Sequence, residues 1–351
     1  METKIIFNID NQISLQDQFT TDVREGLTAP RKYLKPMYFY DEIGSKLFEQ
    51  ICVQPEYYIT RIETELLERY SDVVARMYDS SKELINIIEL GSGSSIKTRI
   101  LLYHFLKKRK IKNVHYFPID ISPSILQETA FNLSYEFSKS LHLNAICSDY
   151  LNGTKKADEL IVGGLSASKE GHNRTIPILK TRKLIVFLGS SIGNMELEDT
   201  KLFLRSIRNK IRKNDLLLVS FDLRKHNEIL NTAYNDKSGI TAKFNLNLLA
   251  RINRELSGMF NLGQFQHHAF YNEIENRIEM HLISKSEQHV YVDKLGKTFY
   301  FKKGETIHTE NSYKYSLKQI QCLAQDTGFE LKKNFTDKRK WFDLALFSAN
   351  S

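Results

Sequence analysis

Long apolar runs and cysteines are both scarce in this sequence. No apolar stretch approaches the roughly 20 residues that a membrane-spanning helix needs, and residues 1–6 do not open a secretory signal. The three cysteines, Cys52, Cys147 and Cys322, are odd in number, far apart and outside any CxxC motif. These absences exclude a disulfide framework, so we expect reduced thiols, a cytoplasmic location and no membrane partner.

Sets of metal ligands, internal repeats and low-complexity tracts are also absent from the sequence. His267 and His268 form the only close histidine pair, and no carboxylates accompany them at ligand spacing, so we expect no metal site. The chain has 351 residues, of which 41% are hydrophobic and 26% are charged. Such a composition is typical of a soluble globular protein with one large or two ordinary domains.

Acidic residues are outnumbered, and the formal net charge is +8. A basic balance is compatible with nucleic-acid binding. The lysines are spread widely, however, and the sequence has no Asn-Pro-Pro-Tyr motif that could hold a flipped base. We therefore expect no nucleic-acid partner. Binding of nucleic acid is kept as an alternative function.

The most informative segment that is present spans residues 87–98. An apolar run ends at Glu89, a turn with Gly91 and Gly93 follows, and a helical pattern begins after it. Glycine has no Cβ and allows a ligand to approach the backbone, while the first amides of the following helix favour a polar group there. This pattern predicts a strand that leads into the loop of a nucleotide-type site.

Strand and helix patterns alternate through the first two thirds of the chain. Apolar runs predict strands at residues 84–90, 115–119, 145–147, 184–188 and 216–221. Helices are expected at residues 62–80, after the glycine turn and from Ser122-Pro123-Ser124 onward. Residues 152–177 carry glycines, serines and mixed charges, and we interpret them as a surface excursion. The alternation predicts an α/β fold with a doubly wound, mainly parallel sheet.

The chain changes character after residue 225. A helical pattern at 231–256 restarts near Gly239, and strand-like segments follow at 268–271, 277–283, 289–292, 298–301 and 309–315. These segments predict a second α+β unit. The chain then returns to a helix that begins at Ser316 and ends at Gly328, and a last strand at 341–347 would close the first sheet with a hairpin-like end.

Four polar or glycine positions follow directly after the predicted strands: Gly91, Asp120, Asp149 and Asn194. Ligands of doubly wound sheets bind beyond the carboxyl ends of the strands, so these positions should converge. Asp120 could hold both hydroxyls of a ribose or cap the next helix. Asp149 and Tyr150 could hold an adenine edge or form an ordinary loop.

The glycine turn is neither a GxGxxG fingerprint nor a phosphate-binding GxxxxGK loop. A kinase or a P-loop ATPase is therefore not expected, and a dinucleotide would normally need more glycine here. A nucleoside that is held without a phosphate-binding loop suggests S-adenosylmethionine.

Several blocks in this order resemble one known family, the histidine-specific methyltransferases of ergothioneine biosynthesis. The resemblance runs from about residue 20 to the end of the chain and is carried by residues 38–48, 55–61, 89–93, 187–194, 234–236, 239–245 and 309–314. It implies trimethylation of the α-amine of L-histidine to hercynine, with S-adenosylmethionine as cofactor and S-adenosylhomocysteine as its product.

The resemblance also implies residue roles and domains. The cofactor would be held by Tyr57, Gly91, Lys97, Asp120, Asp149 and Tyr150. The substrate would be held by Tyr40, Asn194, Tyr234, Met280, Glu310 and Ser312. A class I, Rossmann-like methyltransferase domain would comprise residues 62–224 plus 315–351, and a substrate-binding domain residues 1–61 plus 225–314. We expect a monomer that acts on a small molecule.

The spacing of Glu310 and Ser312 supports a substrate role independently of the resemblance. Glu310 and Ser312 are two residues apart on a strand-like segment, so they share one face and could bind both nitrogens of an imidazole. An exposed polar strand face is the alternative, and packing alone could explain Met280.

Tyr40 and Asn194 would orient the amine, and the Tyr234 hydroxyl would bind the carboxylate. Each could instead be an ordinary buried aromatic or turn residue. We count Tyr40, Asn194 and Glu310 as catalytic candidates that act by positioning and electrostatics, because no histidine-based proton relay is evident.

Three departures from the family pattern are Tyr313, where a smaller residue is usual, Ile59 in place of a proline, and the length of the excursion at 152–177. They leave room for a related substrate. A methyltransferase of another small amine, tryptophan-like or histidine-derived, is the nearest alternative. A nucleic-acid methyltransferase and a non-catalytic binding protein are more distant ones.

Overall fold

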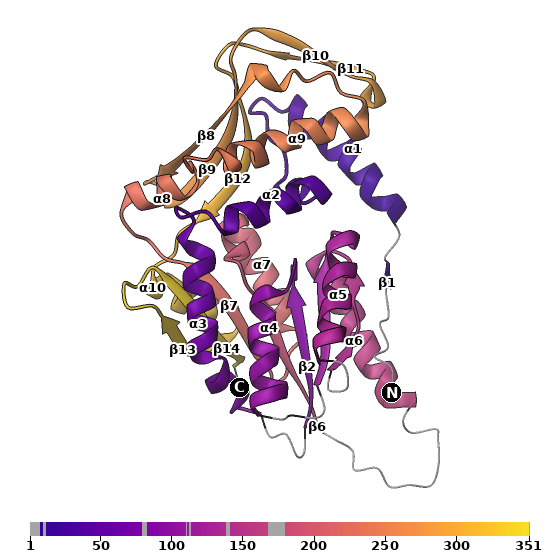
Figure 1. The fold of residues 1–351 in the computed structure, drawn as a ribbon, viewed down its shortest axis with the longest axis vertical. Helices are drawn as coiled ribbons and strands as arrows, with labels where there is room; N and C mark the ends of the chain where they lie inside the picture. Colours follow the sequence, from indigo (N-terminus) through magenta and orange to yellow (C-terminus); the bar gives the residue numbers. More distant parts are fainter. Residues whose placement is uncertain are drawn as a thin grey trace.

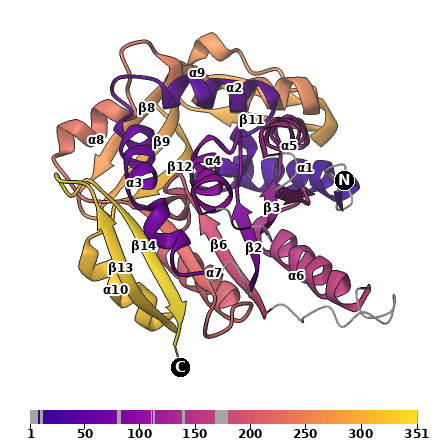
Figure 2. The same ribbon diagram turned by 60° about the horizontal axis from the view of Figure 1, so that its bottom comes forward.

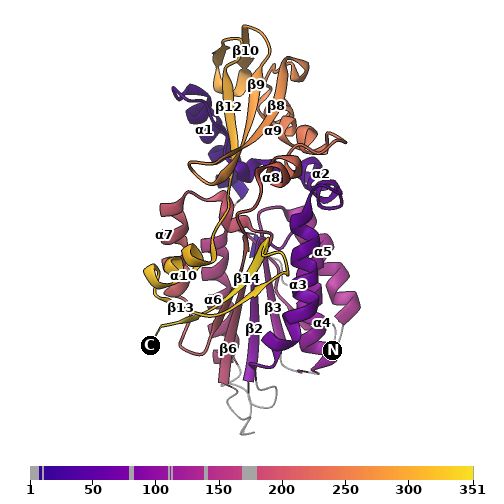
Figure 3. The same cartoon turned by 90° about the vertical axis from the view of Figure 1, so that its left-hand side faces the viewer.

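A computed structural model describes residues 8–9, 12–78, 83–109, 111, 114–137, 141–167 and 180–350. Figure 1 shows a lower region, in which helices cover a sheet, and an upper region of antiparallel strands and helices. The arrow of strand β2 (Glu83–Leu90) points toward the upper region. The carboxyl ends of the parallel strands therefore lie where the two regions meet, as the side view in Figure 3 also shows.

The lower region contains a nine-stranded sheet with the order β1-β5-β3-β2-β6-β7-β14-β13, to which β4 adds by pairing with β3. The other strands of this sheet are β1 (Asn8–Ile9), β3 (Val114–Asp120), β4 (Leu141–Leu143), β5 (Ile146–Cys147), β6 (Lys180–Phe187), β7 (Leu216–Asp222), β13 (Phe329–Thr336) and β14 (Phe342–Ala349). All neighbours are parallel except β14, which runs antiparallel to both β7 and β13.

The chain proceeds from β2 to one side of the sheet and returns to β6 on its other side, so the strand order reverses between β2 and β6. Ligands of doubly wound sheets bind at this point of reversal. The predicted class of fold is confirmed, including the hairpin that closes the sheet.

Burial on both faces explains why these strands are apolar without alternation. Every residue of β7 and β14 is buried. Ile87 packs into one hydrophobic core and its neighbour Ile88 into another, because successive side chains of a strand point to opposite faces. Helices cover both faces, as a parallel sheet requires.

Figure 2 shows the two helical layers. One contains α3 (Tyr58–Ala75), α4 (Ile96–Tyr103), which continues as the π-helical turn η2 (His104–Lys108), and α5 (Pro123–Phe137). The other contains α6 (Tyr150–Ala167), α7 (Leu197–Arg208) and α10 (Leu317–Asp326).

Two sequence interpretations of the lower region are corrected here. The surface excursion expected at 152–177 is helical up to Ala167, and Ala157 and Ile161 are buried against the sheet. Its remaining residues lie outside the described part of the chain. The helix expected at 62–80 begins earlier, at Tyr58, and ends at Ala75.

The upper region contains an antiparallel three-stranded sheet and a hairpin. The sheet has the order β12-β9-β8, and the hairpin pairs β10 with β11. Their bounds are β8 (Phe265–Asn272), β9 (Arg277–Ser284), β10 (Gln288–Val292), β11 (Lys297–Phe301) and β12 (Thr306–Tyr313). Burial alternates along β9, which shows that one face of this sheet packs on the core and the other faces outward.

Helices and short turns complete the upper region. They are α1 (Gln12–Thr28), α2 (Glu42–Cys52), α8 (Asn227–Ala233), α9 (Ile240–Leu256), and the 3-10 turns η1 (Pro36–Phe39), η4 (Leu262–Gln264) and η5 (Asp293–Leu295). Gly239, at φ +68°, separates α8 from α9 where the sequence predicted a restart. The Asp236 side chain accepts hydrogen bonds from the first two amides of α9, those of Ile240 and Thr241.

Strand β12 departs from the alternation of its neighbour β9. All residues from Thr309 to Tyr313 are buried. The reason is that β12 is an edge strand of its sheet and packs against the lower region. An isolated bridge joins Leu223, just after β7, to Tyr315, just after β12. Among the described residues, no helix has the length and apolar character that a membrane span requires.

Candidate active site

The turn after β2 is held by a buried carboxylate. Glu89 accepts hydrogen bonds from the hydroxyls of Thr98, Tyr116 and Ser95, and burial raises its pKa to about 7 despite these donors. These bonds join the end of β2 to the start of α4 and to β3. The backbone then turns through Gly91 at φ +70°, a backbone angle that residues other than glycine rarely adopt.

Gly91 faces the ring of Tyr150, at the start of α6. A Cβ added at Gly91 would lie 3.2 Å from the Tyr150 hydroxyl oxygen, so the absence of a side chain keeps this approach open. A Cβ at Gly93 would meet nothing within 4 Å. The turn is thus bordered by an aromatic ring and by open space, which fits a cradle for a nucleoside ligand.

Asp120, at the end of β3, accepts backbone hydrogen bonds from both neighbouring loops. Its Oδ2 accepts from the Gly93 amide at 2.8 Å and its Oδ1 from the Ser122 amide at 2.9 Å. Burial raises the pKa of Asp120, and the amide donors act against that increase. Each carboxylate oxygen retains a lone pair, so the capping role and a ribose contact are compatible.

Asp149 caps helix α6. Its Oδ1 accepts from the Leu151 and Asn152 amides at 2.9 Å, and its Oδ2 accepts from the Asn152 side chain at 2.7 Å. Asp149 is exposed, whereas Tyr150 packs edge-on against Phe187 at 5.1 Å between ring centres. The pair therefore combines an accessible carboxylate with a fixed ring beside the glycine turn.

Lys97, in the first turn of α4, is paired inside the protein. Its Nζ lies 2.6 Å from Oε2 of the fully buried Glu63, whose Oε1 accepts the Gly189 amide at 2.8 Å. Burial alone would lower the pKa of Lys97, but the Glu63 carboxylate outweighs burial and raises it. Lys97 thus links α4, α3 and the loop after β6.

The upper region contributes β12. Glu310 pairs with Met280 across the β12–β9 ladder, and Ser312 pairs with Ile278. Glu310 is 8% exposed, and burial raises its pKa to about 7, against the influence of Lys314. No side chain of the described residues donates a hydrogen bond to the Glu310 carboxylate. A buried carboxylate without a donor is costly, so this group is suited to a ligand that brings one.

Ser312 belongs to a buried network of hydroxyls and charges. The Tyr234 hydroxyl donates to Ser312 Oγ at 2.8 Å. The Lys314 ammonium donates to Ser312 Oγ at 2.8 Å and to the Tyr234 oxygen at 3.1 Å. Its third contact is Asp222 Oδ2 at 2.9 Å, and neither side chain of that pair has any exposed surface.

The same Asp222 carboxylate, at the end of β7, also binds Lys225 and Tyr58. Lys225 donates to Asp222 Oδ1, and the Tyr58 hydroxyl donates to Asp222 Oδ2 at 2.8 Å. Burial raises the pKa of Asp222, but the two lysines outweigh burial and lower it. Asp222 is therefore ionised and balances part of the positive charge behind Ser312.

Asn194 lies in the 3-10 turn η3 (Ser191–Asn194) after β6, and it is half-buried. A Cβ added at the preceding Gly193 would lie 2.9 Å from the Tyr313 carbonyl oxygen, so this turn packs directly against the backbone of β12. The close approach brings the loop after β6 next to the strand that carries Glu310 and Ser312.

Two tyrosines from the N-terminal segment approach both sets of residues. Burial raises the pKa of Tyr40, and Glu310, Tyr150 and Asp120 are near enough to raise it further. Burial likewise raises the pKa of Tyr57, whose ring lies 6.2 Å from that of Tyr234 in an edge-on contact. Tyr40 is therefore within electrostatic range of residues from both sets.

A comparison with known families identifies the class of protein. A family model described as "Histidine-specific methyltransferase, SAM-dependent" matches residues 19–349. The chain belongs to this family. The predicted family, the S-adenosylmethionine cofactor and the enzyme class are thereby confirmed, and the chain is a methyltransferase.

Curated relatives support this assignment over most of the chain. The histidine N-alpha-methyltransferase of Mycobacterium tuberculosis is 38% identical over 93% of this chain and 93% of that protein. The protein of the same name from Mycolicibacterium smegmatis is 35% identical over 95% of each chain. Ergothioneine biosynthesis protein 1 of Schizosaccharomyces pombe is 30% identical over 93% of this chain and 40% of that protein.

Sequence reasoning missed several residues of this site. Lys314 belongs to the block 309–314, and Asp222 ends a predicted strand, but neither had a visible partner in the sequence. Tyr58 belongs to the block 55–61 but had no role assigned to it, and Glu63 lies outside every block. The only signal was a set of isolated charges beside apolar runs, and such charges become informative only when their partners are known.

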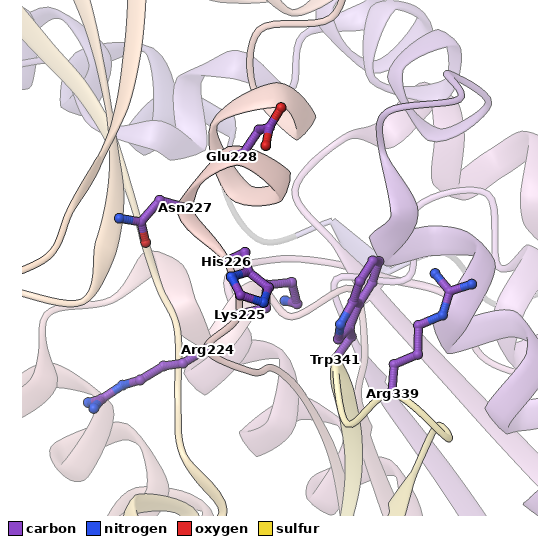
Figure 4. A pocket seen from close by; sticks show the side chains of 7 residues that line it. All are labelled: Arg224, Lys225, His226, Asn227, Glu228, Arg339 and Trp341. Carbon is purple, nitrogen blue, oxygen red and sulfur yellow. The ribbon is translucent and has the colours of Figure 1, made fainter.

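A cavity of about 690 Å³ lies on the surface beside this network. Figure 4 shows Lys225 and His226 on one side of Trp341 and Arg339 on the other, whereas Arg224 extends away. The Lys225 ammonium already donates to Tyr58, Asp222 and the Leu223 carbonyl. None of the predicted site residues lines this cavity. The described part of the chain also holds no cluster of three or more potential metal ligands.

Proposed function

We propose that this methyltransferase trimethylates the α-amine of L-histidine to hercynine, a step of ergothioneine biosynthesis. S-adenosylmethionine supplies an electrophilic methyl group on its sulfonium when it is bound. The observation that carries the proposal is Glu310, a buried carboxylate without a donor that shares a strand face with the Ser312 hydroxyl. Together they match the two nitrogens of an imidazole, one as acceptor and one as donor.

The residues around the glycine turn would hold the cofactor. Asp120 would bind the ribose hydroxyls, and Tyr150 and Asp149 would border the adenine. The open backbone at Gly91 supports this arrangement, while Tyr57 approaches from the N-terminal segment. Lys97, whose ammonium is paired with Glu63, would donate its remaining N–H groups to the cofactor, while Glu63 holds the Gly189 amide beside it.

The amine of the substrate would lie between the two sets of residues. Tyr40 and Asn194 would aim the nitrogen lone pair at the methyl group. A free α-amine titrates near pKa 8 and must be neutral to react. Positioning of the amine would supply most of the rate enhancement, because no strong base faces it among the described residues.

Glu310 would bind an imidazole N–H as an acceptor, which requires the ionised carboxylate. Because its pKa is about 7, this form dominates above neutrality and is lost as the pH falls below 7. We therefore expect histidine affinity to decrease below pH 7 in addition to the effect of amine protonation. Met280, opposite Glu310, would pack against the ring.

Product analysis by mass spectrometry tests the proposal. The methyltransferase is incubated with S-adenosylmethionine and a panel of free amino acids that includes histidine and tryptophan. Addition of three methyl groups to histidine alone is expected. Methylation of another amine with histidine inert would contradict the proposal and favour the nearest alternative.

Substitutions of Glu310 test the substrate site. Glu310→Ala should lower kcat/KM for histidine by about 30- to 150-fold, because the ring loses a charged acceptor worth about 2–3 kcal/mol. Glu310→Gln serves as a matched variant that keeps the shape and removes the charge. S-adenosylmethionine binding, measured by calorimetry, should be unchanged in both. Unchanged histidine turnover in Glu310→Ala would remove Glu310 from the site.

We further propose that residues 62–224 plus 315–351 bind the cofactor and residues 1–61 plus 225–314 close over the substrate. The protein would act as a cytoplasmic monomer, without nucleic acid or membrane as partner. The broad spread of lysines supports the absence of a nucleic-acid surface. Light scattering should give the mass of one chain, and a shift assay at low salt should show no binding of DNA or RNA.

A further inference from the structure

Lys314 is an unusual residue for its surroundings. It is 2% exposed and lies directly after the end of β12, two residues beyond Ser312. Lysine is almost never fully buried without partners, because removing its charge from water is costly. Each of its three N–H groups has an acceptor: Ser312 Oγ, the Tyr234 hydroxyl oxygen and Asp222 Oδ2. The ammonium is therefore fixed in direction as well as in charge.

Two of these three acceptors are hydroxyl groups that the proposed function places against the substrate. A hydroxyl offers one proton and two lone pairs. Lys314 occupies a lone pair on both oxygens, and Ser312 Oγ accepts a second bond from Tyr234. The Ser312 proton is then the group that remains for a ligand. If the Tyr234 hydroxyl donates its hydrogen bond to a substrate carboxylate instead of to Ser312, the hydrogen bond from Lys314 to Ser312 remains in place.

We propose that Lys314 is a positioning residue that fixes Ser312 as a hydrogen-bond donor, so that the site accepts the neutral imidazole ring and rejects the protonated one. This inference rests on the proposed function, because it assumes that the Glu310–Ser312 pair binds the ring. A neutral imidazole has one N–H, which suits Glu310, and one bare nitrogen, which suits a donating Ser312. A protonated ring would direct its second N–H at an oxygen that already accepts the ammonium.

The charged groups around Ser312 support this assignment. Glu310 attracts a protonated ring at one nitrogen, and Lys314 opposes it at the other. Asp222 pairs with both Lys314 and Lys225, so its single negative charge is shared between two ammonium groups and does not neutralise Lys314 fully. Tyr58 and Tyr234 add hydroxyl groups without charge. Removal of Lys314 would remove the positive charge behind Ser312 and leave the Glu310 carboxylate unopposed.

The test compares histidine with β-(1,2,4-triazol-3-yl)-L-alanine, which has the same amine and carboxylate but a ring that protonates only in strong acid. The ratio of the two kcat/KM values cancels the titration of the amine. Because imidazole titrates near pKa 6.5, about nine tenths of it is protonated at pH 5.5, and the ratio in the natural enzyme should fall about tenfold or more between pH 8 and pH 5.5.

Lys314→Met should abolish that fall, so that the ratio changes less than about twofold over the same range. The substitution keeps the length of the side chain, and Asp222 stays paired with Lys225 and Tyr58. Lys225→Met is the matched control: it removes the other lysine of Asp222 and leaves both bonds to Ser312 intact. This control should retain the tenfold fall.

The outcomes separate the two proposals. A tenfold fall in Lys314→Met, equal to that of the natural enzyme, would overturn the role of Lys314 while histidine methylation stands. If the natural enzyme does not methylate histidine at all, the proposed function itself fails. Should Lys314→Met not fold, as judged by circular dichroism, Lys314→Gln removes the charge with a polar side chain and must give the same flat ratio.

Discussion

Asp120 accepts backbone N–H groups from two loops, and this shapes the site before any ligand enters. The bonds to Gly93 and Ser122 fix the carboxylate plane and bring the glycine turn toward the end of β3. The sequence offered a ribose contact and a helix cap as alternatives, and the structure shows a hydrogen bond from the Ser122 amide in the turn that precedes α5. The ribose contact stays a prediction, because the remaining lone pairs leave room for both roles.

Asp120→Asn should weaken cofactor binding by about 10- to 100-fold, since a hydrogen bond to a charged acceptor contributes about 1.5–3 kcal/mol. The amide also has one oxygen fewer for the two backbone donors. Calorimetric titration with S-adenosylhomocysteine measures the effect. Asp326→Asn, at the exposed end of α10, is the control and should bind normally. Equal affinities for all three proteins would exclude Asp120 from the cofactor site.

Tyr313 and Ile59 depart from the family pattern but have structural partners. Tyr313 donates a hydrogen bond to Glu196 at 2.6 Å and accepts one from Arg277 at 2.6 Å, so the larger side chain ties β12 to the segment after η3 and to β9. Ile59 is buried in the first turn of α3. Neither residue removes a predicted ligand.

Among the elements, η3 and β12 determine how the site closes. The 3-10 turn follows β6, which belongs to the nine-stranded sheet, and β12 belongs to the upper sheet. Gly193 allows their backbones to approach, so that η3 packs against the end of β12 at Tyr313. A small residue at this point is needed for close backbone packing and not for a positive φ.

Gly193→Ala should lower kcat/KM for histidine by about 10- to 100-fold, because a Cβ at 2.9 Å from a carbonyl oxygen forces η3 away from β12 and misplaces the amine. Affinity for S-adenosylhomocysteine should change less than about twofold. Gly163→Ala in helix α6, where a Cβ meets nothing within 4 Å, is the control and should leave activity unchanged. Normal turnover by Gly193→Ala would show that the loop tolerates displacement.

For the whole molecule, several buried carboxylates make stability depend on pH. Asp343 in β14 has no exposed surface, accepts a hydrogen bond from Asn334 at 2.6 Å, and has its pKa raised to about 7 by burial. The native state therefore binds this proton more tightly than the unfolded chain. Stability from this group is present in acid and is lost as the pH rises from about 4 through 7. Glu89 and Glu310 act in the same direction.

Asp343→Asn should remove part of this pH dependence, because the amide is neutral at every pH. The free energy of unfolding of the variant, minus that of the natural protein, should be about 1–3 kcal/mol higher at pH 8 than at pH 5. Urea unfolding at both pH values measures the change, and Asp326→Asn is again the exposed control. A constant difference between the variant and the natural protein at both pH values would show that Asp343 does not titrate in this range.

The sequence by itself determined the alternating strands and helices, the glycine turn, the cofactor class and the family. These features depend on local patterns: apolar runs bury strands on both faces, Gly91 permits a left-handed turn, and the block 309–314 carries Glu310 and Ser312 together. The helices of the N-terminal segment and the helical part of 152–167 were not predicted, because polar and mixed composition there hides a narrow buried face.

Only the tertiary structure decided which charges meet. Lys314 and Asp222 are 92 residues apart in the sequence, yet they form a pair with no exposed surface, and Lys97 finds Glu63 from a different helix. Such pairs depend on how sheets and helices pack, because a buried charge is tolerated only where a partner from another element reaches it. The same packing brings Tyr40 and Asn194 toward β12, and thereby joins a cofactor loop to the strand that we propose selects the substrate.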